Sequence, residues 1–68
     1  MNNKLFILRR NRGLSQLQLA RMCGFTQQFI QRIEKGKVEP SIRSAMKIAE
    51  ALGVTVDELV REEVEHAS

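Results

Sequence analysis

Recurring helix-start signals constrain the fold of this 68-residue chain more than any other feature of its sequence. At three places an apolar residue precedes a hydroxyl side chain that can cap a helix: Leu14-Ser15, Phe25-Thr26 and Val54-Thr55. Pro40-Ser41 supplies another start, and Asn2 or Asn3 the first. The glycines stand where helices need to end, at positions 13, 24, 36 and 53. Because no stretch alternates apolar and polar residues as a strand does, the chain is expected to be all-α.

Five helices follow from these signals, over approximately 2–12, 16–23, 27–35, 42–52 and 56–64. Apolar residues recur within them at helical spacing, which predicts a shared core. The expected core residues are Leu5, Leu8, Leu19, Ala20, Cys23, Ile30, Ile33, Ala45, Ile48, Ala49, Leu52 and Leu59. No linker, repeat or low-complexity run interrupts the pattern, so residues 1–68 are expected to form a single domain.

The composition argues against several classes of protein. Cys23 is the only cysteine and His66 the only histidine, so no disulfide, metal site or cofactor is expected. No pairing of nucleophile and base points to catalysis, and the acidic run Glu62, Glu63 and Glu65 fits a solvated face, so an enzyme is not expected. The sequence lacks a long apolar window and has a charged N-terminal stretch, which predicts a cytoplasmic protein without a membrane segment.

The formal net charge of +3 is unevenly divided along the chain. Residues 1–37 hold eight basic side chains and one acidic side chain, Glu34, which gives +7. Residues 38–68 hold three basic and seven acidic side chains, which gives −4. This asymmetry favours a polyanion as the partner of the first half, although small domains also carry uneven charge for solubility alone.

The second and third expected helices carry the strongest functional signal. Only a tight turn fits between Cys23 and Thr26, and Gly24 can adopt the positive φ that such a turn needs. Ala20 is small enough for two helices to cross closely. This pattern predicts a helix-turn-helix, in which the second helix of the pair presents its outer face to the major groove of DNA.

Further short motifs surround this pair, in a fixed order over approximately 4–60. They are Ser15-Gln16, Leu19-Ala20, Gly24, Ile30, Glu34, Gly36, Pro40-Ser41 and Ala51-Leu52-Gly53-Val54. Together they resemble the phage repressor/Cro family of helix-turn-helix regulators, also called xenobiotic-response-element-like. The resemblance implies a compact five-helix, lambda-repressor-like fold and a cytoplasmic transcriptional regulator, bacterial or phage-encoded. It also implies a repressor that binds a near-palindromic duplex operator as a homodimer.

The third helix offers candidate base contacts. Thr26 as N-cap places Gln27 and Gln28 on the exposed first turn, and a glutamine amide can pair with both N6 and N7 of adenine. Arg32, one turn later, suits guanine or a phosphate. The base-contacting positions of the family match Gln27, Gln28 and Arg32. Without the surrounding motif, a solvated polar face would be the better interpretation.

Phe29 departs from the family pattern, in which a small or polar residue is common at this position. It either flanks the core between the second and third helices or contacts a thymine methyl group. The sequence leaves both interpretations open.

Phosphate contacts are expected to hold the third helix in register. Gln16 lies at the start of a helix, where exposed N–H groups favour an anion, and Ser15 combines this position with a role as cap. Arg10 could reach the same surface from the first helix. The remaining candidates lie where the family commonly touches the backbone: Lys35, Lys37 and Arg43. Each cation alone is better explained as solvated, but their one-sided placement favours contact.

The resemblance assigns a structural ion pair to Arg9 and Glu34, joining the first and third helices. Homodimer formation is expected through Val60 and Val64 together with Phe6 and Ile7, unless these residues serve wider packing. An antitoxin, controller or adaptor-type module, in which protein–protein interaction is the main role, remains the alternative function. A regulatory protein partner is possible in either case.

Overall fold

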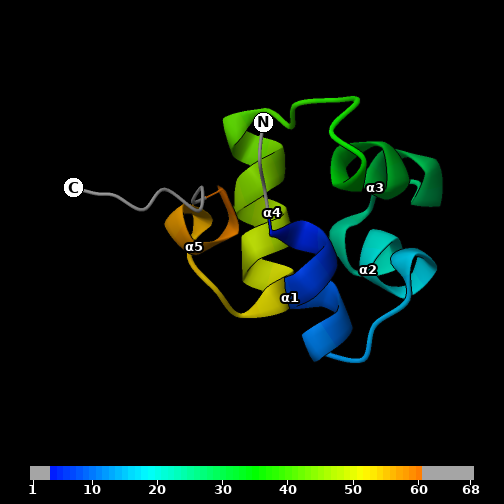
Figure 1. Cartoon of the computed structure of the whole chain (residues 1–68), viewed down its shortest axis with the longest axis horizontal. Helices are drawn as coiled ribbons and strands as arrows, with labels where there is room; N and C mark the ends of the chain where they lie inside the picture. The colour runs from blue at the N-terminus through cyan, green and yellow to red at the C-terminus, as the bar shows by residue number, and fades with distance from the viewer. Residues whose placement is uncertain (1–3, 61–68) are drawn as a thin grey trace.

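The structure, a computed structural model, describes residues 4–60 and contains five helices and no strand in that range. The helices are α1 (Leu5–Asn11), α2 (Gln16–Cys23), α3 (Gln27–Glu34), α4 (Ile42–Leu52) and α5 (Val56–Val60). In Figure 1, α4 lies at the centre, with α2 and α3 on one side and α5 on the other. The expected all-α fold with a helix-turn-helix at α2 and α3 is confirmed.

Three helix ends in the described range differ from the expected ones. Asn2 and Asn3 lie outside the described residues, and α1 begins only at Leu5, because Lys4 has a non-helical backbone with φ −107° and ψ 19°. The Lys4 N–H donates to the carbonyl of Leu59 at 3.0 Å, so this residue is tied to α5. At the other end α1 stops at Asn11, and α3 stops at Glu34. The expected extension of α5 to residue 64 lies outside the described residues.

Side-chain caps fix the starts of the other helices. At α2, Ser15 Oγ accepts from the N–H of Gln18 at 3.0 Å, and Gln18 Oε1 accepts from the N–H of Ser15 at 2.8 Å. This reciprocal pair satisfies two N–H groups that the helix itself leaves without partners. Thr26, Ser41 and Thr55 cap α3, α4 and α5 through their hydroxyl oxygens, each accepting from the N–H three residues later. Each such cap stabilises its helix by about 1 kcal/mol.

The core between the helices consists of side chains that the sequence pattern predicts. Its largest fully buried members are Leu5, Leu19, Ile30, Ile33, Ile48 and Leu52. Leu8 is the exception, since it is only partly buried and packs against this core. The reason lies in the geometry of α1, where Leu5 and Arg9, one turn apart, occupy the buried stripe and leave Leu8 at its edge. The core therefore fixes α2 and α3 against α4.

Between residues 4 and 60, no helix combines the length and the apolar character needed to cross a membrane.

Candidate nucleic-acid interface

The turn between α2 and α3 sets the orientation of α3. Gly24 adopts the left-handed conformation with φ 75°, and the N–H of Phe25 donates to the carbonyl of Ala20 at 2.8 Å. Ala20 is completely buried, which allows the two helices to approach closely. A hydrogen-bonded turn this short leaves little freedom for α3 to move relative to α2.

The two faces of α3 have opposite character. Ile30 and Ile33 are buried in the core, whereas Gln27, Gln28 and Arg32 are exposed. Within residues 4–60, the side chains of these three polar residues have no hydrogen-bond or ion-pair partner, so their donors and acceptors are available to a ligand. The structure therefore places all three candidate base-contacting residues on one accessible helix, beginning at its capped first turn.

Phe29 lies between these two faces. Its ring is half-buried and meets the ring of Phe25 in an edge-to-face arrangement, with centroids 5.0 Å apart and an interplanar angle of 81°. Such a pair adds about 0.5–1.5 kcal/mol to the stability gained by burial. The packing of Phe29 supports a structural role, while the part of the ring that stays exposed is open to an apolar contact.

A hydrogen-bonded network lies at the C-terminal end of α3. Arg9 Nε lies 2.5 Å from Glu34 Oε2, and a second guanidinium N–H donates to Glu34 Oε1 at 3.2 Å. The third donor of Arg9 reaches the carbonyl of Leu14 at 2.7 Å. Both side chains are shielded from solvent, with exposed fractions of 8% for Arg9 and 6% for Glu34. The only acidic residue of the basic half is thus neutralised by a buried partner.

Gln16 joins this network, a contact that the sequence analysis did not foresee. Its Nε2 donates to Glu34 Oε1 at 3.1 Å, which fixes the first residue of α2 beside the last residue of α3. One amide N–H is used in this bond, and an amide nitrogen carries a second. Gln16 can therefore keep its contact with Glu34 and still donate to a phosphate.

The other candidate phosphate contacts surround the ends of α2, α3 and α4. Lys35 and Lys37 are exposed in the loop after α3, and Arg43 is exposed on the first turn of α4. Arg10 is exposed on α1, where its guanidinium lies 5.3 Å from the ring centroid of Phe6. The hydroxyl oxygen of Ser15 accepts the capping hydrogen bond, which leaves its O–H free to donate.

The residues expected at a dimer interface do not share one environment. Phe6 and Ile7 are exposed on α1, whereas Val60 is partly buried against the core, and Val64 lies outside the described residues. Other large apolar side chains are also exposed although the sequence analysis did not single them out: Met22, Ile42 and Met46. The helical spacing of the buried residues of α4 could have placed Ile42 and Met46 on its outer face.

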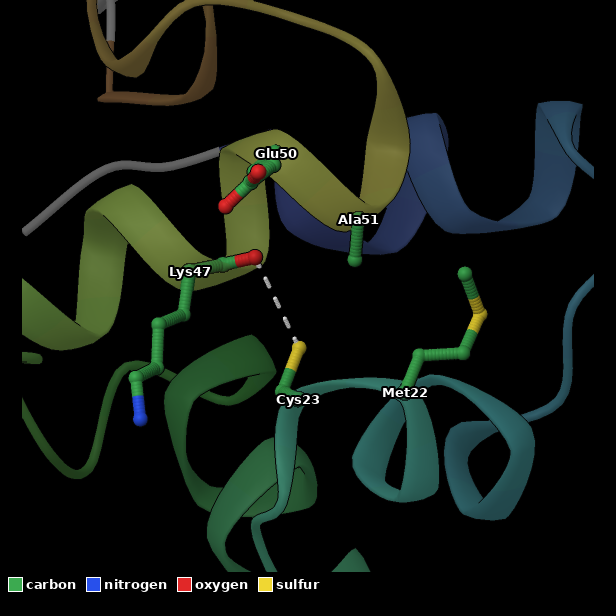
Figure 2. Close-up of a pocket in the computed structure, with 5 residues that line it drawn as sticks. All are labelled: Met22, Cys23, Lys47, Glu50 and Ala51. Carbon is green, nitrogen blue, oxygen red and sulfur yellow. Dashed lines mark hydrogen bonds between the residues drawn. The ribbon is translucent and has the colours of Figure 1, made fainter.

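Cys23 lines a hollow of about 330 Å³ between α2 and α4 together with Met22, Lys47, Glu50 and Ala51 (Figure 2). Its thiol lies 3.8 Å from the carbonyl of Lys47, as a weak hydrogen-bond donor. Burial raises the pKa of the Cys23 thiol, and the positive charge of Lys47 offsets only part of this effect. The protonated thiol therefore serves packing, and in the described part of the chain no cluster of three potential metal ligands occurs.

Known proteins resemble this chain over most of its length. A helix-turn-helix family model matches residues 5–59. An uncharacterised helix-turn-helix-type transcriptional regulator of Methanocaldococcus jannaschii is 42% identical over 59 residues, covering 87% of this chain and 89% of that protein. The immunity repressor protein of Bacillus phage phi105 is 30% identical over 63 residues, covering 93% of this chain and 44% of the repressor. The similarity thus extends from α1 into α5.

Among solved structures, the restriction-modification controller protein C.AhdI from Aeromonas hydrophila has a similar fold. It matches with a TM-score of 0.78 and 33% sequence identity, over 81% of this chain and 80% of the controller. The similarity to a solved structure therefore also includes most of the chain.

Proposed function

This chain belongs to the phage repressor/Cro type of the helix-turn-helix family, whose members are transcriptional regulators and not enzymes, and we propose that it is a sequence-specific DNA-binding repressor. In this proposal residues 1–68 form one cytoplasmic DNA-binding domain, α3 enters the major groove, and the protein acts as a homodimer. The observation that carries the proposal is the outward face of α3, where three polar side chains are exposed and have no partner within residues 4–60, while the opposite face of the helix is buried in the core.

Base recognition is assigned to the first two turns of α3. Gln27 and Gln28 can each pair an amide with N6 and N7 of adenine, and Arg32 can donate two hydrogen bonds to O6 and N7 of guanine. Phe29 adds an apolar contact with a thymine methyl group through the exposed part of its ring. These contacts supply specificity because each base pair presents a distinct pattern of donors and acceptors in the major groove.

Phosphate contacts are assigned to the residues around α3. Gln16 donates from the start of α2, next to N–H groups that favour an anion, and Ser15 adds its hydroxyl. Lys35, Lys37 and Arg43 contact the backbone beyond α3, and Arg10 does so from α1. These contacts fix the register of α3 without carrying sequence information themselves.

Two copies would place their α3 helices in successive major grooves, about 34 Å apart, on a near-palindromic site. The immunity repressor function of the phage phi105 relative supports a repressor role for this chain. A controller function is the second candidate, supported by the similarity to the restriction-modification controller of Aeromonas hydrophila. In an antitoxin, controller or adaptor-type module, protein–protein interaction is the main role. A regulatory protein partner would therefore distinguish this class from a repressor that acts alone.

Selection from a library of random duplexes tests the DNA-reading proposal. The wild-type protein is expected to enrich one near-palindromic sequence, and its affinity should fall steeply as the salt concentration rises. A variant with Gln27, Gln28 and Arg32 all replaced by alanine should lose that preference. Arg21→Ala is the matched control, since Arg21 is an exposed cation of α2 outside the proposed contacts. Equal enrichment by the triple variant and the wild-type protein would refute the assignment of α3.

A further inference from the structure

We propose that the outward face of α4 is a self-complementary surface on which a second copy of this chain docks with its α4 antiparallel to the first. This α4 face consists of Ile42, Arg43, Met46, Lys47 and Glu50, which line a hollow of about 590 Å³. The inference rests on the proposed function only in that it identifies the surface used by the proposed homodimer.

The apolar part of the α4 face is open to solvent. Ile42 is 72% exposed and Met46 is 56% exposed, and the two residues are one helical turn apart. The buried residues of α4 occupy the opposite side of the helix: Ala45, Ile48, Ala49 and Leu52. Ile42 and Met46 therefore face away from the core of their own subunit, and nothing else within residues 4–60 shields them as a partner would.

The charges on the same face specify a second copy of the chain as the partner. Arg43 and Glu50 are seven residues apart, which is two helical turns or about 10.5 Å along α4. Within residues 4–60, neither side chain has a hydrogen-bond or ion-pair partner, and Figure 2 shows the Lys47 and Glu50 side chains pointing in different directions. A twofold axis near Met46 would set each Arg43 opposite the partner's Glu50 and bring the apolar residues together between the two ion pairs. The guanidinium of Arg43 has five N–H donors, so this ion pair leaves donors for the phosphate contact that the proposed function assigns to Arg43.

The exposed apolar residues of α1 lack this complementarity. Phe6 and Ile7 are 48% and 56% exposed, but α1 contains no acidic residue, and the Arg10 guanidinium lies over the Phe6 ring. Pairing two α1 helices about a twofold axis would therefore bring like charges together. The hollow next to Met22, by contrast, shares Lys47 and Glu50 with the α4 face, so the surface continues towards α2.

Single substitutions to cysteine, each in the presence of the buried native Cys23, locate the interface. Met46→Cys, Ile7→Cys and Met22→Cys form a matched set, because the native side chains are 56%, 56% and 55% exposed. Under mild oxidation without DNA, Met46→Cys is expected to give a disulfide-linked dimer as the main product, since a residue near a twofold axis lies next to its own copy. The other two variants and the wild-type protein should stay largely unlinked. Dominant cross-linking through position 7 or 22, or none at position 46, would overturn the proposal.

A charge exchange tests the pairing itself, with light scattering on the DNA-free protein and thermal melts to verify folding. Arg43→Glu and Glu50→Arg should each raise the dimer dissociation constant roughly tenfold or more, because each places like charges opposite one another twice. The double variant should restore the dissociation constant to within about threefold of the wild-type value. A wild-type protein that stays monomeric at millimolar concentration, or a double variant no better than the single ones, would refute the α4 interface. The library selection decides separately on DNA reading, so either proposal can fail while the other stands.

Discussion

The polar side chains at the two ends of α3 differ in whether they have partners within the protein. At the C-terminal end, the Glu34 side chain is only 6% exposed and accepts hydrogen bonds from both Arg9 and Gln16, so its carboxylate is paired within the protein. At the N-terminal end, Gln27 and Gln28 are exposed, and within residues 4–60 their side chains have no partner. The comparison separates two tasks on one short helix, because paired groups hold the scaffold together whereas unpaired groups are free to bind a ligand.

The largest expected effect on stability comes from removing the buried ion pair at the C-terminal end of α3. Glu34→Ala leaves the buried Arg9 guanidinium without its counter-charge, and should lower the free energy of unfolding by about 3–5 kcal/mol in urea denaturation. The double variant with Arg9→Met and Glu34→Leu should recover most of this loss, because apolar side chains can replace a buried ion pair. A loss below about 1 kcal/mol in Glu34→Ala would show that this end of α3 does not depend on the pair.

Gln28→Ala tests the unpaired end and should show the reverse pattern. The free energy of unfolding is expected to change by no more than about 0.5 kcal/mol, since the side chain is exposed and has no partner in the described range 4–60. Binding to the selected sequence should weaken by about 1–3 kcal/mol, with relaxed preference at one base pair. Titrations against duplexes substituted at each position measure this change, and an unaltered preference would contradict base contact by Gln28.

Gln16→Met tests both kinds of polar group at once, because Gln16 donates to Glu34 within the protein and is also a proposed phosphate contact. Loss of the hydrogen bond to Glu34 should lower the free energy of unfolding by about 1 kcal/mol, while the methionine keeps the volume of the side chain. DNA affinity should fall by a similar factor for all sequences, since a phosphate contact carries no base information. A loss confined to one base pair would instead assign Gln16 to base recognition.

Lys37→Ala is expected to have the smallest effect. Removing one phosphate contact should weaken binding to all duplexes alike and reduce the slope of log affinity against log salt by about 1. The free energy of unfolding should not change measurably, because Lys37 is exposed. Affinities measured at several salt concentrations supply the slope, and an unchanged slope would mean that Lys37 is only solvated.

The sequence predicted those features of the fold that depend on near neighbours. The cap at Ser15 and its partner Gln18 are three residues apart, and the buried residues of α4 follow from helical periodicity alone. Leu8 was predicted to be a core residue but is only partly buried, because helical periodicity gives the direction of the buried stripe but not its width. The start of α1 was wrong because the Lys4 N–H bonds to Leu59, a distant residue that local signals do not include.

Candidate site residues divide in the same way. The exposure of Gln27 and Gln28 follows from the position of Thr26 as a cap, so local pattern was sufficient. The Gln16–Glu34 hydrogen bond joins residues eighteen positions apart, and its existence depends on how closely α2 and α3 cross. The α4 face was missed for another reason, since exposure of an apolar residue becomes visible only when the opposite side of its helix is known to be buried.

The hydrogen bond between Lys4 and Leu59 has a consequence for chain topology. It brings the Lys4 nitrogen to within 3.0 Å of the Leu59 oxygen, so the two ends of the described range, residues 4–60, lie side by side. Chains whose ends lie together often tolerate circular permutation. A permuted chain opened in the exposed loop at Lys37, with a short peptide joining Val60 to Lys4, is therefore expected to reach the same packing with α4 and α5 preceding α1. The fold would then not depend on the order in which the five helices follow one another along the chain.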